Sequence, residues 1–220
     1  MSSGADPTCG AWPTARLLLA CGMAAPVLAI ASTLVATLAS PGFDPARHYL
    51  SELGGRTASA RLIFNAGVFV AGVMAGVAGA GFGLGIAALT NARVAGGLTA
   101  AVFILSGYGL TQAALFPWPN PRHLAINLAL GIQLAPLLLA WGLRSRADVG
   151  RLKVFLVLVF GMMVVLTVLT KHMILPRLVN DTNVGWWERA YAIVLVSWVG
   201  VAALLLDRRL RRAASARKDA

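Results

Sequence analysis

Six long apolar segments separated by short polar connections constrain what this chain can fold into more than any other feature of its sequence. A helix that crosses a membrane needs about 20 consecutive, mostly apolar residues. The segments that reach or approach this length are residues 16–39, 62–89, 94–116, 124–143, 152–170 and 190–206. Because lipid offers no hydrogen bonds to an open backbone, these segments predict an all-α polytopic membrane bundle of six transmembrane helices.

The composition agrees with a membrane protein and argues against a nucleic-acid-binding one. Of the 220 residues, 58% are hydrophobic and only 12% are charged, whereas a soluble domain is about 25% charged. The net charge of +11 would suit nucleic acid if the basic residues formed one soluble face. They lie instead between the apolar segments, so we expect no nucleic acid partner.

The distribution of Lys and Arg predicts the orientation of the bundle. Twelve of the nineteen lie in or beside the terminal tails and the second and fourth connections, and seven lie in the other three connections. Because basic residues favour the cytoplasmic side, we expect a multi-pass protein of the cell membrane with both termini in the cytoplasm. The chain then divides into an N-terminal tail (1–15), a transmembrane domain (16–206) and a basic C-terminal tail (207–220).

Polar side chains gather toward the side opposite the termini. The histidines and glutamates that fall there are His48, His123, His172, Glu52 and Glu188. The uncharged polar residues in the outer halves of the spans are Asn65, Gln112, Asn127, Thr167, Thr170 and Tyr191. Polar groups within a membrane usually face the bundle interior or a wet cavity. The pattern therefore predicts an outward-opening polar pocket, with scattered hydrogen bonds between helices as the alternative.

The polar stretch FDPARHYLSELGGR connects the first two spans. Its Asp-Pro start and Gly-Gly end predict a short interfacial helix of two to three turns. In such a helix His48 and Glu52 are four residues apart, so their side chains would meet. Three roles for Glu52 stay open: a general acid or base, a ligand for a cationic or hydroxylic group, or a partner of His48 or Arg56 that holds the loop.

Two further polar clusters flank later spans. In NVGWWERAYAIVL, Glu188 lies near a helix N-terminus, where a negative charge is favoured, and Arg189 could pair with Glu52 or hold a phosphate as a planar fork. In FPWPNPRHLAIN, His123 shares a helix face with Asn127. His123 and His172 could ligate a metal or a haem, but neither lies in a ligand motif, so we predict no metal and no cofactor.

The second span is rich in glycine. Its Gly72-Val-Met-Ala-Gly76 pattern lets helices approach closely. This pattern predicts a packing face, either within one chain or between chains. A homo-oligomer or a partner subunit held through the second helix is therefore one expected form of association.

Five short segments occur in a defined order: YLSELGG (49–55), LIFNAG (62–67), LFP (115–117), the histidine at 123 and GWWER (185–189). In order and spacing, over about residues 24–206, they resemble a bacterial and archaeal membrane family known as domain-of-unknown-function family 998. The resemblance implies a six-helix membrane protein. It implies little chemistry, because none is assigned to the family.

Two functional hypotheses follow. The first is an outward pocket that binds a lipid or isoprenoid, or modifies it by acid/base isomerisation, cyclisation or hydrolysis. Its candidate catalytic residues are Glu52, His48 and His123. Its candidate ligand-binding residues are Asn65, Gln112, Trp118, Asn127, Glu188 and Arg189. The alternative is a transporter or an accessory subunit of a membrane complex, although no inverted repeat and no acidic residue deep within a span supports a self-standing carrier.

Overall fold

The computed structural model describes residues 11–170 and 175–218, and all regular structure in this part of the chain is helical. The long helices are α1 (Ala11–Leu38), α2 (Arg61–Thr90), α3 (Arg93–Leu115), α6 (Gly150–Thr170) and α7 (Val184–Lys218). The fourth crossing is a run of η2 (Pro121–Ala125), α4 (Ile126–Ala129), η3 (Leu130–Leu134) and α5 (Ala135–Gly142). Six helical runs in the described residues are long and apolar enough to cross a membrane, which confirms the predicted fold class.

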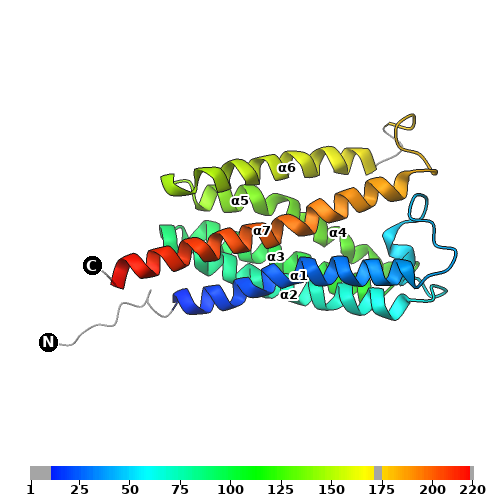
Figure 1. The fold of residues 1–220 in the computed structure, drawn as a ribbon, viewed down its shortest axis with the longest axis horizontal. Coiled ribbons are helices and arrows are strands. Elements are labelled where there is room, and N and C mark those ends of the chain that lie inside the picture. The colour runs from blue at the N-terminus through cyan, green and yellow to red at the C-terminus, as the bar shows by residue number, and fades with distance from the viewer. Residues whose placement is uncertain (1–10, 171–174, 219–220) are drawn as a thin grey trace.

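The helices lie side by side along the long axis of the molecule, with both termini at one end (Figure 1). The α1–α2 and α6–α7 connections lie at the other end, which we call the loop end. Helix α2 packs against α1 and α3, and α7 packs against both α1 and α6. The sequence predicted that its polar clusters gather on the side opposite the termini, and the loop end is that side.

Glycines allow α2 and α3 to approach almost to backbone contact. A Cβ on Gly96 of α3 would lie 2.6 Å from the carbonyl oxygen of Gly83 on α2. A Cβ on Gly72 of α2 would lie 2.9 Å from the carbonyl oxygen of Gly107 on α3. The predicted packing face of the second span is thus occupied within the chain. Association with another subunit through this helix stays a prediction.

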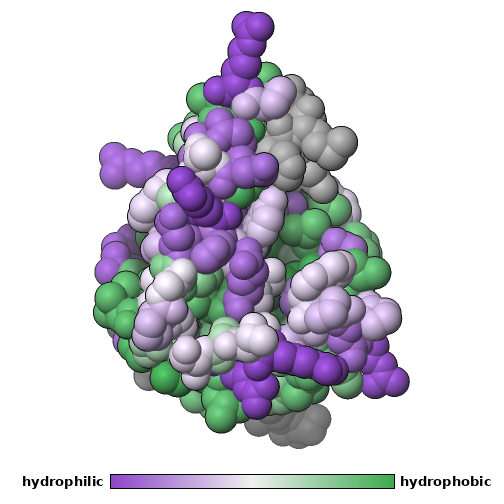
Figure 2. Space-filling model, turned by 90° about the vertical axis from the view of Figure 1, so that its right-hand side faces the viewer, coloured by the Kyte–Doolittle hydropathy of each residue, from purple (hydrophilic) through white to green (hydrophobic). Residues whose placement is uncertain are grey.

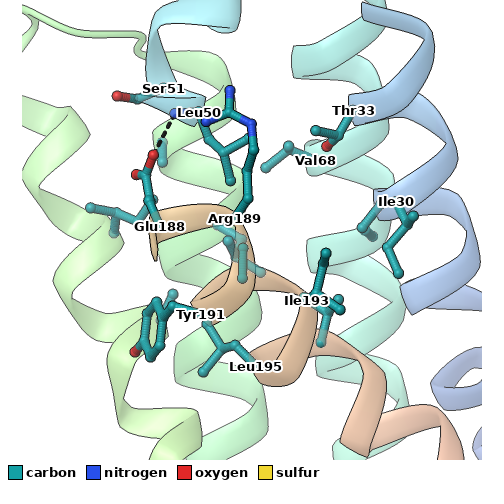
Figure 3. A pocket seen from close by; sticks show the side chains of 18 of the residues that line it. Ile30, Thr33, Leu50, Ser51, Val68, Glu188, Arg189, Tyr191, Ile193 and Leu195 are labelled. Carbon is teal, nitrogen blue, oxygen red and sulfur yellow. Dashed lines mark hydrogen bonds between the residues drawn. The ribbon is translucent and has the colours of Figure 1, made fainter. Parts of the chain in front are cut away.

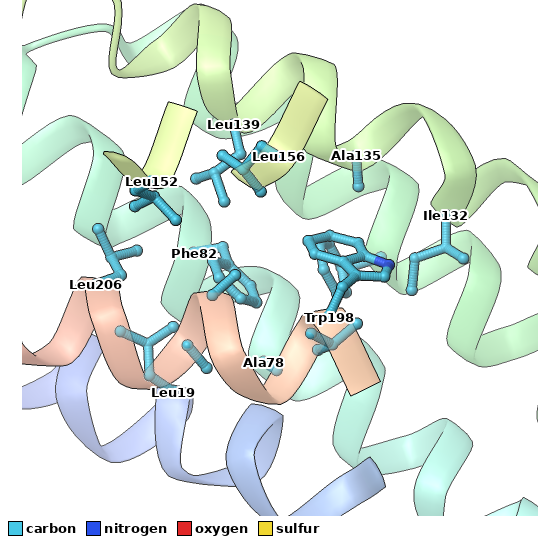
Figure 4. Close-up of a cluster of buried hydrophobic side chains, with 14 of the residues drawn as sticks. Leu19, Ala78, Phe82, Ile132, Ala135, Leu139, Leu152, Leu156, Trp198 and Leu206 are labelled. Atoms are coloured by element: carbon cyan, nitrogen blue, oxygen red, sulfur yellow. The ribbon is translucent and has the colours of Figure 1, made fainter. Parts of the chain in front are cut away.

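An aromatic cluster forms the centre of the bundle between α2, α3 and α7 (Figure 4). The rings of Phe82 and Phe103 stack with centroids 4.9 Å apart, and Trp198 lies 5.8 Å from Phe103. All three side chains are almost fully buried. Because lipid tails are as apolar as these side chains, close packing rather than escape from water stabilises this centre.

The fourth crossing is not the continuous α-helix that the sequence predicted. It alternates between 3₁₀ and α geometry before Pro136, which lies in the first turn of α5. Proline is favoured in a first turn because it has no N–H to donate, so a new helix begins there. Since a 3₁₀ helix has three residues per turn, the predicted shared face of His123 and Asn127 is lost. Asn127 is exposed.

The predicted interfacial helix is present but shorter than expected. A turn spans residues 44–48, and the 3₁₀ helix η1 (Leu50–Gly54) follows it. The Asp44 amide donates to Nδ1 of His48 (3.0 Å), and the Tyr49 amide donates to Oε1 of Glu52 (2.7 Å). These local backbone bonds compete with α-helix formation. His48 and Glu52 therefore bond to the backbone instead of to each other.

An ion-pair cluster lies at the end of the bundle that holds the termini. Asp207 of α7 is only 4% exposed and accepts hydrogen bonds from Nε of Arg16 on α1 (2.8 Å) and Nε of Arg211 (2.7 Å). This cluster joins the first helix to the last. The predicted basic C-terminal segment continues α7 as helix through Lys218.

Candidate functional site

A cavity of about 840 Å³ lies in the half of the bundle next to the loop end. Its walls come from α1, α2, α3, the fourth crossing and the first half of α7 (Figure 3). Most of the side chains that line it are apolar. The polar ones are Thr33, Thr37, Ser51, Asn65, Ser106, His123, Glu188, Arg189 and Tyr191. The volume falls within the range of small-molecule sites, about 300–1,000 Å³.

Small side chains leave this space open between the helices. The alanines that line it are Ala25 and Ala29 on α1, Ala71 and Ala75 on α2, and Ala113 and Ala114 on α3. On one side Ile30 of α1 and Ile193 of α7 face each other across the cavity (Figure 3), and they are 40% and 51% exposed.

The charged residues of the cavity, Glu188 and Arg189, both lie near the start of α7. Oε2 of Glu188 accepts a hydrogen bond from the Leu50 amide at 2.6 Å (Figure 3). Nη1 of Arg189 donates to the carbonyl oxygens of His48 (3.0 Å) and Gly185 (2.8 Å). Neither side chain forms an ion pair with any described residue. Both therefore connect α7 to the α1–α2 connection through its backbone.

The guanidinium of Arg189 is held in one orientation. Besides its two hydrogen bonds, its Cζ lies 5.2 Å from the ring centroid of Phe43, within cation–π range. The His48 ring in turn lies 5.2 Å from Phe43. Nη2 of Arg189 is buried and has no hydrogen-bond partner among the described residues. One donor of a fixed cation thus lacks a partner among the described residues beside the polar end of the cavity.

A glycine at the start of α7 allows the α1–α2 connection to lie directly against the helix. The Gly185 amide donates to the Ala46 carbonyl at 2.7 Å. A Cβ on Gly185 would lie 2.8 Å from the carbonyl oxygens of Ala46 and His48, and closer still to that of Pro45. Any larger residue there would push the connection away from α7.

We therefore expect Gly185→Ala to loosen the α1–α2 connection. The overlap with backbone carbonyls should cost about 1–3 kcal/mol of local stability, which corresponds to amide exchange about tenfold faster or more in residues 43–54. Hydrogen exchange of the purified protein measures this. Gly161→Ala in α6, where a Cβ would have no neighbour within 4 Å, should leave exchange unchanged. Equal amide exchange rates in the two variants would contradict the close approach of the α1–α2 connection to Gly185.

The beginning of α2 contacts the same connection. Nδ2 of Asn65 donates to the Gly54 carbonyl at 3.1 Å, and Asn65 also lines the cavity. Tyr49 lies nearby; partial burial, and next the negative charge of Glu188, raise the pKa of its hydroxyl. Tyr49 thus stays a neutral hydrogen-bonding group at physiological pH.

His123 enters the cavity from η2. Its Nδ1 lies 3.1 Å from the carbonyl oxygens of both Ala113 and Phe116. Because a carbonyl oxygen can only accept, Nδ1 carries the proton in these bonds. In the neutral imidazole Nε2 is then an acceptor, and it has no hydrogen bond to any described residue.

The structure brings together five of the residues that the sequence singled out: Asn65, His123, Glu188, Arg189 and Tyr191 line the cavity. The others do not line it. Glu52 is exposed and bonds to the Tyr49 amide. His48 lies behind Arg189 and supports it through its carbonyl oxygen. The carboxylate at the cavity is therefore Glu188, and Arg189 does not pair with Glu52.

Three predicted ligand-binding residues lie elsewhere. Trp118 is 58% exposed, with its ring 6.4 Å from that of His123. Asn127 is exposed, and Gln112 is half-buried outside the cavity lining. The sequence interpretation also missed Thr33 and Thr37, which are four residues apart on one face of α1. Their spacing could have indicated a polar face on this helix, but two threonines in an apolar span are a weak indication of a site.

No group of three or more His, Cys, Asp or Glu side chains that could hold a metal ion occurs in residues 11–170 and 175–218. His172, the other candidate metal or haem ligand, lies outside the described residues.

Viewed onto the loop end, the molecule shows hydrophilic side chains gathered over the connections (Figure 2). The segments that carry the family resemblance meet here: the η1 connection bonds to Glu188 and Asn65, and His123 bonds to the end of α3. A family model described as a protein of unknown function (DUF998) matches residues 23–205. No curated protein and no solved structure matches the chain.

Proposed function

The chain belongs to the DUF998 family of proteins of unknown function, and we propose that its cavity binds a membrane lipid or isoprenoid and modifies it by acid/base chemistry. The observation that carries this proposal is the composition of the cavity. Its walls are apolar over most of their length, and the charged side chains among the described residues that line it, Glu188 and Arg189, lie at one end. An amphiphile has the same division between an apolar chain and a polar head.

The position of the cavity in the membrane supports the same class of ligand. Ile30 of α1 and Ile193 of α7 line the cavity and are 40% and 51% exposed, so we infer that the cavity opens toward lipid between these two helices. A chain dissolved in the bilayer can reach the cavity between α1 and α7 without crossing water. A water-soluble ligand would gain little from walls that are almost entirely hydrocarbon.

Glu188 and His123 are the groups that could move a proton on such a ligand. One carboxylate oxygen of Glu188 bonds to the Leu50 amide, and the other has no hydrogen bond to a described residue. Nε2 of His123 is likewise unbonded. A carboxylate and an imidazole that line one cavity suit general acid and base roles. Isomerisation, cyclisation and hydrolysis are the reaction classes that this pair can serve.

We infer that the cavity faces the outer leaflet of the cell membrane. Arg16, Arg144, Arg146 and the basic part of α7 lie at the end of the bundle that holds the termini, opposite the cavity. The excess of basic residues at that end favours the cytoplasm. Cysteine labelling from outside intact cells at Ser59→Cys, with Ser145→Cys as the inner control, tests this orientation.

We expect Glu188→Gln to lower turnover by about 100-fold or more, because general acid or base groups contribute rate factors of about that size or larger. The glutamine oxygen can still accept from the Leu50 amide, so the loop should stay in place. The assay incubates purified protein with a membrane lipid and isoprenoid extract and follows conversion by mass spectrometry. Glu52→Gln is the matched control, because Glu52 is exposed and outside the cavity.

Two outcomes would contradict this proposal. Full turnover by the Glu188→Gln variant would remove Glu188 as the proton donor or acceptor. Retention of as much co-purified lipid by Ala71→Phe, which fills the cavity wall, as by the natural protein would show that lipid does not occupy the cavity. Stoichiometric co-purification of another membrane protein with an empty cavity would favour the alternative of an accessory subunit.

A further inference from the structure

We propose that the ligand carries an anionic head group, a phosphate or a carboxylate, which Arg189 binds at the polar end of the cavity. This inference rests on the proposed function and narrows its substrate class. It follows from the hydrogen bonds, the burial and the surrounding charges of one side chain.

The first step concerns the geometry of Arg189. Both hydrogen bonds that it makes come from Nη1, to the carbonyl oxygens of His48 and Gly185. The ring of Phe43 lies against the guanidinium. Nη2 is buried without a partner among the described residues, and Nε makes no hydrogen bond to them either. The Nε–Nη2 edge thus makes no hydrogen bond to a described residue, and that edge is a planar fork that matches two oxygens of a phosphate or carboxylate.

The second step concerns the neighbouring negative charges. The carboxylates near Arg189 are Asp44, Glu52 and Glu188. Asp44 accepts from the Ala46 amide, Glu52 from the Tyr49 amide and Glu188 from the Leu50 amide. None of the three forms an ion pair with Arg189. The three carboxylates near the Arg189 guanidinium therefore accept hydrogen bonds from backbone amides and not from Arg189.

The third step concerns the cost of that arrangement. A buried donor on a charged group that lacks a partner is unfavourable, more so than for a neutral group. Arg189 keeps such a donor at a cavity whose other walls are apolar. An anionic head would offer two oxygens to the Nε–Nη2 edge and form a bidentate pair with it. A neutral alcohol head offers a single oxygen.

The experiment compares matched amphiphiles on the natural protein. Farnesyl phosphate is paired with farnesol, and palmitate with hexadecanol, with dissociation constants measured in detergent by calorimetry. We expect the anionic member of each pair to bind about tenfold more tightly or better, as for hydrogen bonds to charged groups. Inorganic phosphate alone is the further arm, and it should bind far more weakly than farnesyl phosphate.

The outcomes separate this inference from the proposed function. Equal binding of anion and alcohol would overturn the anionic head group and leave lipid binding intact. No binding by any of the four amphiphiles would count against the proposed function itself. Inorganic phosphate that binds as tightly as farnesyl phosphate would show that the site takes free phosphate instead of a lipid head.

Variants test whether Arg189 is responsible for the preference for anionic amphiphiles. Arg189→Gln should remove the preference for the anion, and Arg189→Lys, which keeps the charge without the fork, should reduce it. Arg122→Gln is the control, because Arg122 lies at the same end of the bundle, is exposed and does not line the cavity. An unchanged preference in Arg189→Gln would overturn the assignment. If that variant does not fold, the comparison of amphiphiles on the natural protein decides the question.

Discussion

Asp207→Ala is expected to destabilise the helix bundle by about 3 kcal/mol, toward the low end of the range for breaking a buried ion pair. The Asp207 side chain is almost fully buried, and it holds Arg16 at 2.8 Å and Arg211 at 2.7 Å. Its loss would leave the partly buried Arg16 without its partner and would remove the ion pair that joins α1 to α7. The estimate is at the low end because the Arg211 side chain is 62% exposed.

Unfolding of the purified protein in mixed micelles with increasing sodium dodecyl sulfate measures this free energy. The matched control is Asp148→Ala. The Asp148 side chain is 40% exposed and also contacts two arginines, Arg146 and Arg209. Exposed pairs contribute about 0–1 kcal/mol, so the control should lose little. Similar losses in the two variants would show that burial of Asp207 does not matter.

Asp207→Asn separates the charge of this residue from its shape. The asparagine fills the same space and offers one acceptor oxygen to Arg16, but it cannot balance two guanidinium groups. We expect a loss between those of the natural protein and Asp207→Ala. A loss as large as that of the alanine variant would place the whole effect in the charge.

Gly96→Ala and Gly97→Ala should change stability in opposite directions, although the two residues are adjacent and the chemical change is the same. A Cβ on Gly96 would lie 2.6 Å from the Gly83 carbonyl oxygen on α2, whereas a Cβ on Gly97 would have no neighbour within 4 Å. Overpacking against backbone costs about 1–3 kcal/mol. Replacing an unhindered helical glycine by alanine gains about 0.5–1 kcal/mol.

The same micelle titration measures both variants. The direction of each stability change is more informative than its size, because detergent shifts the unfolding free energies of all variants together. The two glycines are adjacent, so they share one environment. A stabilising Gly96→Ala would mean that α2 and α3 are farther apart than described here. A destabilising Gly97→Ala would mean that this exposed face of α3 packs against another chain, which would support an oligomer.

The predicted number of crossings needed no tertiary information. Each span could be counted because lipid excludes any backbone that does not satisfy its own hydrogen bonds, so length and hydropathy were sufficient. The break in the fourth crossing was not predicted. Pro136 was visible in the sequence, but proline is tolerated within membrane helices when neighbours satisfy the freed groups. Whether it breaks a helix therefore depends on packing.

The candidate site shows the same limit. The sequence indicated that polar residues gather at one end, and five of the predicted residues do line the cavity: Asn65, His123, Glu188, Arg189 and Tyr191. Spacing along the chain favoured Glu52, because an α-helix would have placed it beside His48. Glu52 instead accepts a hydrogen bond from the backbone amide of Tyr49, three residues before it. Which of Glu52 and Glu188 lies at the cavity therefore depended on local geometry, which spacing along the chain does not determine.

What the sequence determined by itself is the membrane-spanning character of the chain and the end at which its polar residues gather, since both depend only on the order of apolar and polar residues. The tertiary structure alone decided that Glu188, and not Glu52, is the carboxylate at the cavity, and that Glu188 and Arg189 hold the α1–α2 connection. The Glu188–Leu50 bond joins residues 138 positions apart. Such a contact depends on how close α7 comes to that connection, and Gly185 sets that distance through packing that no local pattern encodes.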